Sequence, residues 1–296
     1  MESAPTGTRR GCSDEYTART KFGQGPCGRL RAADGGKAAV AGLWRAARHE
    51  APGAVWRNRA DFGPFYKQFA RADLLIAIGG DGTILHAAKH TLDAGKPLLG
   101  INAGRLGFMA SLERSQLGYL ERLVRGVYSI EHRMLLEVAH HAAEGTRRYQ
   151  ALNDAVLSKG GISRMVDLDV YCKGRLVGSY RSDGVIFSTP TGSTAYALSA
   201  GGPIIDPSVE TILMTPICPH SLTSKAMLFA ADTELAVRPG ETNREDVYLT
   251  VDGEDAVKLG KEDTVEIRRS DKTVRLIRLT DRSFYEIVSD KLMGRR

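Results

Sequence analysis

An apolar segment that ends directly in a glycine-rich loop constrains the fold of this chain more than any other feature. Residues 72–78 are almost all apolar, as expected of a parallel strand covered on both faces, and the loop 79–83 (Gly-Gly-Asp-Gly-Thr) follows at once. Residues 84–92 have the pattern of a helix, and residues 97–102 that of a second strand. Strand, loop, helix and strand in this order predict a right-handed βαβ unit within an α/β domain.

The loop 79–83 has the chemistry of a phosphate site. It follows its strand at the edge where open α/β sheets bind ligands, and the next helix offers unpaired N–H groups. The candidate phosphate loop comprises Gly79, Gly80, Gly82 and Thr83. Asp81 is the exception, because a carboxylate repels phosphate unless it accepts a proton from a hydroxyl or holds a metal. We interpret Asp81 as a general base or metal ligand.

Other nucleotide and metal motifs are missing from the sequence. There is no GxxxxGK[ST] segment, which argues against the P-loop class of nucleotide hydrolases. His86 and His90 are four residues apart on the predicted helix, a spacing that suits two metal ligands, but no third ligand is visible. We interpret them as ordinary helix-surface histidines.

The second half of the chain has the texture of an all-β domain. A helix is expected at 115–124, and short alternating segments separated by turns follow it. The predicted strands are 133–140, 148–157, 167–172, 175–180, 185–188, 228–230, 235–237, 247–251 and 264–269. The predicted fold class is therefore an α/β domain with a Rossmann-like open sheet plus an all-β C-terminal domain.

The first residues differ from the rest in texture. Residues 1–36 contain no run of four apolar residues, so we expect a disordered or aberrant segment. Residues 38–49 have apolar positions at helical spacing and predict an amphipathic helix. A GxGxxG pattern at 23–28 follows no strand, and we attribute it to chance.

Charge and cysteine usage limit which partners and which cellular compartment are expected. Residues 1–60 hold 11 Lys and Arg against 5 Asp and Glu, an excess that equals the net charge of +6, so the remainder is formally neutral. Nucleic-acid binding is not expected without clustered cations, and no segment approaches the roughly 18 apolar residues of a membrane span. The four cysteines form no CxxC pair. We expect a cytoplasmic protein that binds neither nucleic acid nor membrane.

Residues 189–202 are rich in hydroxyls and glycines and follow a predicted strand. Such a segment offers donors to a polar ligand and room for backbone contact. The same composition also suits a turn that caps a helix at 195–199. Composition leaves both interpretations open.

Several motifs, taken together, resemble the motif series of the NAD kinases in order and spacing. Besides the loop 79–83 they are 102–108 (Asn-Ala-Gly-Arg-Leu-Gly-Phe), 153–156 (Asn-Asp-Ala-Val), 183–184 (Asp-Gly) with 190–196 (Pro-Thr-Gly-Ser-Thr-Ala-Tyr), and 219–222 (Pro-His-Ser-Leu). The glycine loop alone also resembles that of diacylglycerol or sphingosine kinases, whereas the segment 190–196 is typical of NAD kinases. Residues 283–288 resemble the tail that returns to the first domain in this family.

The resemblance implies roles for individual residues. Asp81 would be the catalytic base or a metal-organising carboxylate, and Gly82 would let the ligand approach. Asn153 and Asp154 would hold the nicotinamide-side ribose. The residues from Thr194 to Ser199 would surround the adenosine together with Asp183, and Arg164 and Arg181 would face phosphates. The full candidate NAD-binding set is Asp81, Gly82, Asn153, Asp154, Arg164, Arg181, Asp183, Thr191, Thr194, Ala195, Tyr196, Ala197, Leu198, Ser199, Cys218 and Glu254.

The resemblance also implies an activity, cofactors and an assembly. The chain would phosphorylate the 2′-hydroxyl of the adenosine ribose of NAD with ATP and Mg²⁺, as a homo-oligomer, a dimer or tetramer. A basic residue at Arg181 goes with ATP and oxidised NAD in related enzymes, and glycine there goes with tolerance of polyphosphate. The alternatives are a lipid kinase of the diacylglycerol or sphingosine type and a catalytically inactive dinucleotide-binding protein.

Three departures from the family pattern bear on these expectations. Asp154 stands where many relatives carry Glu, and Glu254 where Gln is frequent. Relatives open with an apolar strand that residues 1–36 lack, so we expect a sheet without its first strand or an altered reading frame. The predicted domains are an aberrant segment at 1–36, an α/β domain at 37–125 plus about 275–296, and an all-β NAD-binding domain at 126–274.

Overall fold

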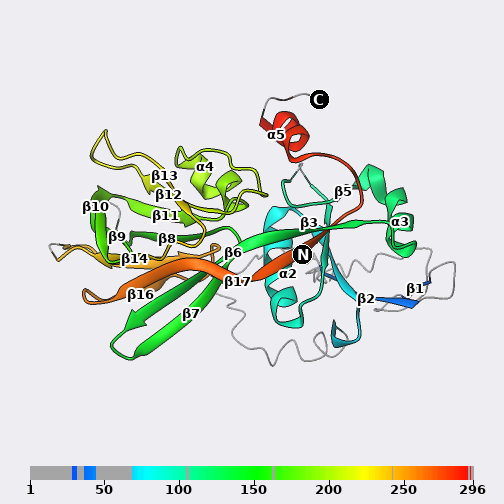
Figure 1. Ribbon diagram of the computed structural model, residues 1–296, viewed down its shortest axis with the longest axis horizontal. Coiled ribbons are helices and arrows are strands. Elements are labelled where there is room, and N and C mark those ends of the chain that lie inside the picture. The colour runs from blue at the N-terminus through cyan, green and yellow to red at the C-terminus, as the bar shows by residue number, and fades with distance from the viewer. Residues whose placement is uncertain are drawn as a thin grey trace, which may run out of the picture.

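The computed structural model describes residues 29–31, 37–44, 69–104, 107–161, 164–241, 243–292 and 294. Figure 1 shows two lobes side by side, one with helices packed on a sheet and one built almost wholly of strands. We call them the α/β lobe and the β lobe. This architecture confirms the predicted fold class.

The α/β lobe is organised around the predicted βαβ unit. Strands β3 (Leu74–Gly79) and β4 (Leu98–Asn102) are parallel neighbours, and helix α2 (Asp81–Ala94) connects them. All five residues of β4 and the first four of β3 are buried, which explains their continuous apolar sequence. The lobe continues with β5 (Leu112–Glu113), the 3₁₀ turn η2 (Arg114–Tyr119) and α3 (Leu120–Val124).

The predicted helix at 38–49 is wrong where the structure describes it. Strand β2 (Lys37–Trp44) pairs in parallel with β3, and β1 (Arg29–Arg31) pairs antiparallel with β2. The small and β-branched apolar residues of this segment fit either period, and the open edge of β3 decides for a strand. Of the two alternatives expected for the start of the chain, a sheet without its first strand is therefore wrong, and an altered reading frame stays a prediction. Residues 45–49, the GxGxxG segment at 23–28 and all of 1–36 except 29–31 lie outside the described residues.

The β lobe packs two sheets face to face. One is six-stranded in the order β13-β12-β11-β8-β15-β16, with every pairing antiparallel. Its strands are β8 (Asp154–Lys159), β11 (Gly184–Ser188), β12 (Thr211–Ile217), β13 (Met227–Ala230), β15 (Val247–Val251) and β16 (Val257–Leu259). Opposite lie β6 (Ser129–Ala142), β7 (Gly145–Ala151), β9 (Val166–Cys172), β10 (Arg175–Ser182), β14 (Leu235–Pro239) and β17 (Thr264–Arg278).

The two longest strands run from one lobe into the other. β6 and β17 pair antiparallel along nearly their whole length, and Leu276 of β17 pairs in parallel with Leu98 of β4. One eleven-stranded sheet therefore extends from β1 to β10 through both lobes (Figure 1). The register shifts between Arg269 and Thr273, and the strand predicted to stop at 269 continues to 278.

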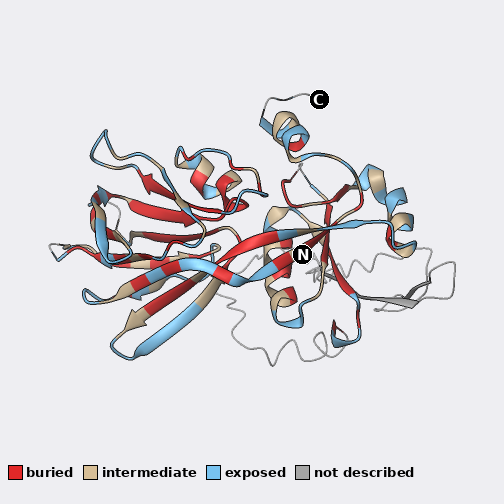
Figure 2. Cartoon of the chain, in the orientation of Figure 1, coloured by how far each residue is buried: buried red, intermediate tan, exposed pale blue. Residues whose placement is uncertain are grey.

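Buried residues lie on the strands of both sheets and on α2 (Figure 2). The largest core joins both sheets of the β lobe, for example through Leu157, Phe187 and Ile267. A second core places Ile84 and Ala87 of α2 against Leu135 and Leu152, so the helix after the glycine loop packs beside the turn that leads into β8. Packing thus brings two of the sequence motifs together.

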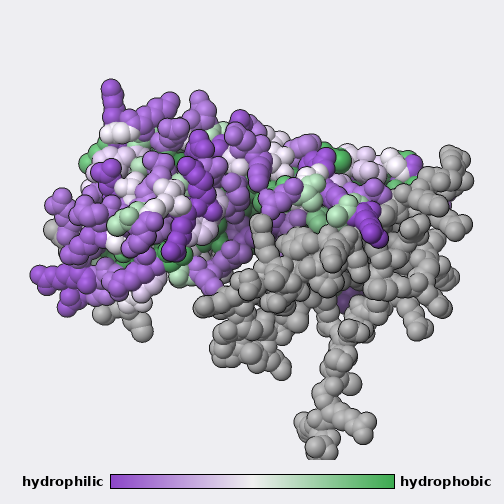
Figure 3. Space-filling view, turned by 90° about the horizontal axis from the view of Figure 1, so that it is seen from below, coloured by the Kyte–Doolittle hydropathy of each residue, from purple (hydrophilic) through white to green (hydrophobic). Residues whose placement is uncertain are grey.

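The chain end lies on the α/β lobe, as the sequence predicts. After β17, helix α5 (Phe284–Leu292) lies at the top of Figure 1 beside this lobe. Within the described residues no helix has the length and apolarity needed to cross a membrane. The face of the molecule seen in Figure 3 presents mainly hydrophilic described residues.

Candidate active site

The glycine loop joins the end of β3 directly to the start of α2. β3 ends at Gly79, and Gly80 is the N-cap of a helix of 14 residues. A Cβ at Gly79 would lie 2.3 Å from the hydroxyl oxygen of Thr83, so only glycine fits there. A Cβ at Gly80 or Gly82 would meet nothing within 4 Å, which leaves the loop open to a ligand at the positive end of the helix dipole.

Backbone N–H groups hold the Asp81 carboxylate in one orientation. Phe108 N–H donates to Oδ2 at 2.9 Å, and Met109 N–H donates to Oδ1 at 3.1 Å. A Cβ at Gly107 would lie 2.2 Å from Oδ1, so the carboxylate fits only because that residue is glycine. The second motif of the sequence, 102–108, thus supports Asp81. Arg105 and Leu106 of that motif lie outside the described residues.

A buried carboxylate that the sequence analysis did not single out fixes the turn before β8. The two oxygens of Asp252 accept hydrogen bonds from the N–H groups of Leu152, Asn153 and Asp154 at 2.8–3.1 Å. Asp252 has a left-handed φ of 50° in the turn between β15 and β16, and its N–H donates to the Asp154 carbonyl. This side chain therefore sets the position of both predicted ribose-binding residues, Asn153 and Asp154.

The hydroxyl-rich turn packs directly on the same segment. Thr189 N–H donates to the Asn153 carbonyl at 2.9 Å, and the Thr189 hydroxyl donates to the Leu152 carbonyl. A Cβ at Gly192 would lie 2.0 Å from the Asn153 carbonyl oxygen, so two motifs that are far apart in the sequence touch through backbone atoms. The buried Arg133 donates to the Thr191 hydroxyl from β6 at 3.1 Å.

The helix at 195–199, predicted as one interpretation of this turn, is present as α4 (Tyr196–Ser199) and follows the 3₁₀ turn η3 (Gly192–Thr194). Ala197 is buried in a small core, whereas Tyr196 is 46% exposed. Leu198 and Ser199 complete the helix, and Ala195 is its N-cap. The turn therefore forms the short helix α4, and Tyr196 on that helix stays accessible to a ligand.

Lys89 connects the two lobes. It lies on α2 about two turns after Asp81, and its ammonium is 2.7 Å from Glu254 Oε1 and 3.8 Å from Asp252 Oδ2. Glu254, a predicted site residue, thus forms an ion pair with Lys89 at the surface. The pair ties the helix that carries Asp81 to the turn that positions Asn153 and Asp154.

Burial perturbs the Asp154 carboxyl. Its removal from water and the neighbouring Asp252 charge raise the pKa of Asp154 to about 7. Burial also raises the pKa of Asp252, although Lys89 and the three N–H donors oppose the shift. Two acidic groups in one desolvated site disfavour the doubly charged state.

Stability is expected to fall as pH rises from about 4 to about 7. The folded state holds the Asp154 proton up to about pH 7, whereas the unfolded chain releases it near 3.8. Asp154→Asn should remove about 2–4 kcal/mol of this pH dependence. Urea unfolding at pH 4 and pH 7.5 measures the difference, with the exposed Asp232→Asn as control. Equal pH dependence in Asp154→Asn and wild type would contradict the assignment.

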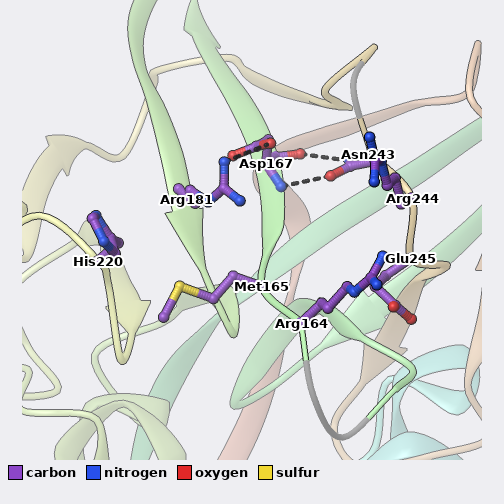
Figure 4. A pocket seen from close by; sticks show the side chains of 8 residues that line it. All are labelled: Arg164, Met165, Asp167, Arg181, His220, Asn243, Arg244 and Glu245. Atoms are coloured by element: carbon purple, nitrogen blue, oxygen red, sulfur yellow. Dashed lines mark hydrogen bonds and ion pairs between the residues drawn. The ribbon is translucent and has the colours of Figure 1, made fainter.

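Both predicted phosphate-facing arginines line one open pocket of about 720 Å³ (Figure 4). The lining residues are Arg164, Met165, Asp167, Arg181, His220, Asn243, Arg244 and Glu245. Arg181 lies 4.0 Å from the Asp167 carboxylate, and the Asp167 backbone exchanges two 2.7 Å hydrogen bonds with the Asn243 side chain. The pocket thus gathers three arginines, and Asp81 is not among its lining residues.

Two further predicted residues lie beside this pocket. Asp183 follows β10 and pairs with Lys159 at 2.6 Å, and its N–H donates to the Ile217 carbonyl. Cys218, directly after β12, is exposed and has a left-handed φ of 45°. His220 N–H donates to the Arg181 carbonyl. The motif 219–222 is thus held against the strand that carries Arg181.

Among the described residues, no third ligand joins the histidine pair of α2. Burial, the neighbouring His86 and Lys89 lower the pKa of His90 to about 4, and the two rings are 5.3 Å apart. Across the described ranges, no group of three or more His, Cys, Asp or Glu side chains could hold a metal ion. A Mg²⁺ ion that is carried largely by substrate phosphates needs only one or two carboxylates from the protein.

A glycine loop at a helix N-terminus beside a fixed carboxylate, with a second lobe that presents a hydroxyl-rich turn, is the arrangement expected of a phosphotransferase. Comparison with family models narrows this class. The ATP-NAD kinase N-terminal domain matches residues 35–128, and the ATP-NAD kinase C-terminal domain matches residues 152–279. The chain belongs to the NAD kinase family.

Individual relatives agree with this assignment. The NAD kinase of Symbiobacterium thermophilum is 44% identical over 234 residues, which cover 76% of this chain and 80% of that protein. The NAD kinase of Moorella thermoacetica is 43% identical over 75% of this chain and 71% of its own length. Yeast NADH kinase, solved in complex with NADH, superposes with a TM-score of 0.70 at 30% identity, over 78% of this chain and 68% of that one.

Proposed function

We propose that the chain is an NAD kinase, which transfers the terminal phosphoryl group of ATP to the 2′-hydroxyl of the adenosine ribose of NAD. The observation that carries the proposal is the Asp81 carboxylate, held by two N–H groups beside an open glycine loop. Family membership supports the same activity. The product is NADP.

The reaction needs one proton acceptor and one phosphate site. Asp81 accepts the proton of the 2′-hydroxyl as that oxygen forms a bond to the γ-phosphorus. The bond from the γ-phosphorus to the bridging oxygen breaks, and ADP leaves with its electron pair. The N–H groups of the first turn of α2 face the phosphates, and Gly80 and Gly82 leave room for them. Mg²⁺, when bound, would neutralise phosphate charge, with Asp81 as the carboxylate available to it.

The acceptor is placed by the β lobe. In the proposal, Asn153 and Asp154 hold one ribose, and Asp183 together with Thr194–Ser199 holds the adenosine. The contacts among Asp252, Asn153 and Gly192 support this assignment, because they make one rigid unit of the segments concerned. The exposed Tyr196 and Cys218 are available to a bound dinucleotide.

A coupled assay with a parallel binding measurement tests the proposal. The purified chain is incubated with ATP, Mg²⁺ and NAD, and NADP is detected with an NADP-specific dehydrogenase, while calorimetry measures NAD binding. NADP formation supports the kinase. NAD binding without NADP would indicate an inactive dinucleotide-binding protein, and phosphorylation of diacylglycerol alone would indicate a lipid kinase. The family matches do not favour either alternative.

Gly107→Ala tests the role of the Asp81 support. The added methyl group would lie 2.2 Å from Oδ1 and displace the carboxylate, so we expect kcat to fall about 10²-fold. Gly104→Ala in the same segment is the control, because its methyl group meets nothing within 4 Å. Initial rates at saturating NAD and ATP give the comparison. A Gly107→Ala enzyme with wild-type kcat would separate this support from catalysis.

Arg181 is proposed to set donor choice. Its guanidinium lies in the pocket that also contains Arg164 and Arg244, where triphosphate oxygens can be met (Figure 4). Arg181→Gly should raise the ratio of polyphosphate to ATP use in NADP formation, whereas Arg238→Gly, an arginine stacked on Tyr171, should leave it unchanged. If wild type already uses both donors equally, or if the ratio stays constant, Arg181 has no part in donor selection.

We propose a Mg²⁺-dependent, cytoplasmic homo-oligomer that acts in NADP biosynthesis. We also propose a division of the chain near residues 125 and 275, with 126–274 as the NAD-binding domain. The change from helix-covered parallel strands to antiparallel sheets after α3 supports this boundary.

A further inference from the structure

The C-terminal helix α5 reaches the carboxylate at the centre of the proposed site. Lys291, in its last turn, places its ammonium 3.6 Å from Asp81 Oδ2. The same ammonium lies 4.0 Å from the centroid of the Phe108 ring. Phe108 also supplies one of the two N–H groups that hold Asp81. Lys291, Phe108 and Asp81 therefore form a compact group drawn from three separate parts of the chain.

α5 is held in place independently of Lys291. Ser283 and Glu286 cap its first turn by reciprocal hydrogen bonds, and Ile287 is buried. Phe284 packs on Phe108 with ring centroids 6.3 Å apart. The Tyr285 hydroxyl donates to Asp206 of the β lobe, and this bond raises the pKa of Tyr285. The helix is thus fastened to both lobes.

These contacts hold a long, flexible side chain where an ordinary surface lysine would not remain. An exposed ion pair alone is weak, because two mobile side chains lose entropy to form it. Here the aromatic face holds the ammonium from one side by a cation–π contact, and the carboxylate holds it from the other. Both the Lys291 and the Asp81 side chains are 32% exposed, so a ligand can still reach the pair.

We propose that Lys291 is a positioning residue for Asp81, and that the C-terminal helix completes the phosphoryl-transfer centre by supplying it. The inference rests on the proposed kinase function, in which Asp81 meets the ribose hydroxyl. Lys291 fixes Oδ2 beside Phe108 and so keeps the Asp81 carboxylate in the orientation that the ribose hydroxyl needs. The centre thus unites the glycine loop, the loop after β4 and the chain end.

Three variants test the inference in the full chain with ATP, Mg²⁺ and NAD. Lys291→Met should lower kcat about tenfold and change KM for NAD less than twofold, because the effect lies on the reacting carboxylate. Lys291→Arg should restore most of the rate, since a guanidinium also pairs with a carboxylate and stacks on an aromatic ring. Lys272→Met, which removes an exposed pair with Asp93, should match wild type.

A double-mutant cycle separates positioning from general structural support. In an Asp81→Asn background, Lys291→Met should cause no further loss, because its partner charge is gone. Equal fractional losses in both backgrounds would overturn the inference, as would an unchanged or increased kcat in Lys291→Met. A raised KM with unchanged kcat would also overturn it. A wild-type protein that forms no NADP would instead refute the kinase function itself, and the two failures are therefore distinct.

Discussion

Asp81→Asn is expected to lower kcat by about 10²–10⁴-fold while NAD affinity changes little. The amide keeps the size of the carboxylate but cannot accept the proton of the 2′-hydroxyl or neutralise a cation. It can accept one of the two N–H bonds from Phe108 and Met109, and its NH₂ group faces the other donor. The loss of the negative charge and the loss of one supporting hydrogen bond both lower kcat.

The measurement compares NADP formation with calorimetric NAD binding for the same preparation. Asp93→Asn is the matched control, since Asp93 lies near the other end of the same helix and is exposed. Melting temperatures confirm that both variants fold. An Asp81→Asn enzyme with near-normal kcat would remove Asp81 from the mechanism, and a large loss of NAD affinity would make it a binding residue.

Asp252→Ala should lower the free energy of unfolding by about 3 kcal/mol or more. Three backbone N–H groups, of Leu152, Asn153 and Asp154, lose their acceptor at once. A buried donor left without a partner costs about 1–3 kcal/mol, and water that enters the vacated space recovers part of that cost. Lys89 loses one of its two carboxylate neighbours as well.

NAD binding should weaken together with stability in Asp252→Ala, because the turn that Asp252 holds carries the two proposed ribose-binding residues. We expect a melting temperature lower by about 6–12 degrees, from about 2–4 degrees per kcal/mol in a chain of this size. NAD binding by calorimetry should weaken in the fraction that remains folded. Asp255→Ala, an exposed carboxylate three residues on, is the control. Similar melting temperatures for the two variants would show that the turn does not depend on Asp252.

The parts of the fold that could be predicted have local causes. The strand before Gly79 is apolar because both faces are covered, and the helix after the loop follows from its own periodicity. The segment 37–44 could not be assigned in this way, because its conformation depends on the edge of β3 rather than on its own pattern. Strand β12 was not predicted either. It contains Pro216, and a proline normally argues against a central strand.

The site residues likewise divide into those that lie in local motifs and those that meet only in the folded chain. The resemblance identified candidates that lie within compact motifs, such as Asp81 and Asn153. It did not reveal Asp252, which supports residues about 100 positions earlier, or Lys291, which meets Asp81 only after the chain has returned to the first lobe. The turn at 152–153 that splits the predicted strand 148–157 into β7 and β8 was hidden for the same reason. The residues of the turn do not indicate that the distant Asp252 carboxylate accepts their N–H groups.

The ladder of β6 and β17 has a mechanical consequence. A flexible linker would let two lobes swing freely about a hinge, but here a hydrogen-bonded ribbon runs from one lobe into the other and joins β4. Opening the space between the lobes by a large rotation would break ladder bonds, so relative motion is limited to twisting of the ribbon, most easily where its register shifts between Arg269 and Thr273. We therefore expect the two lobes to unfold in one cooperative transition, because each lobe keeps its strand pairing only while the shared ribbon is intact.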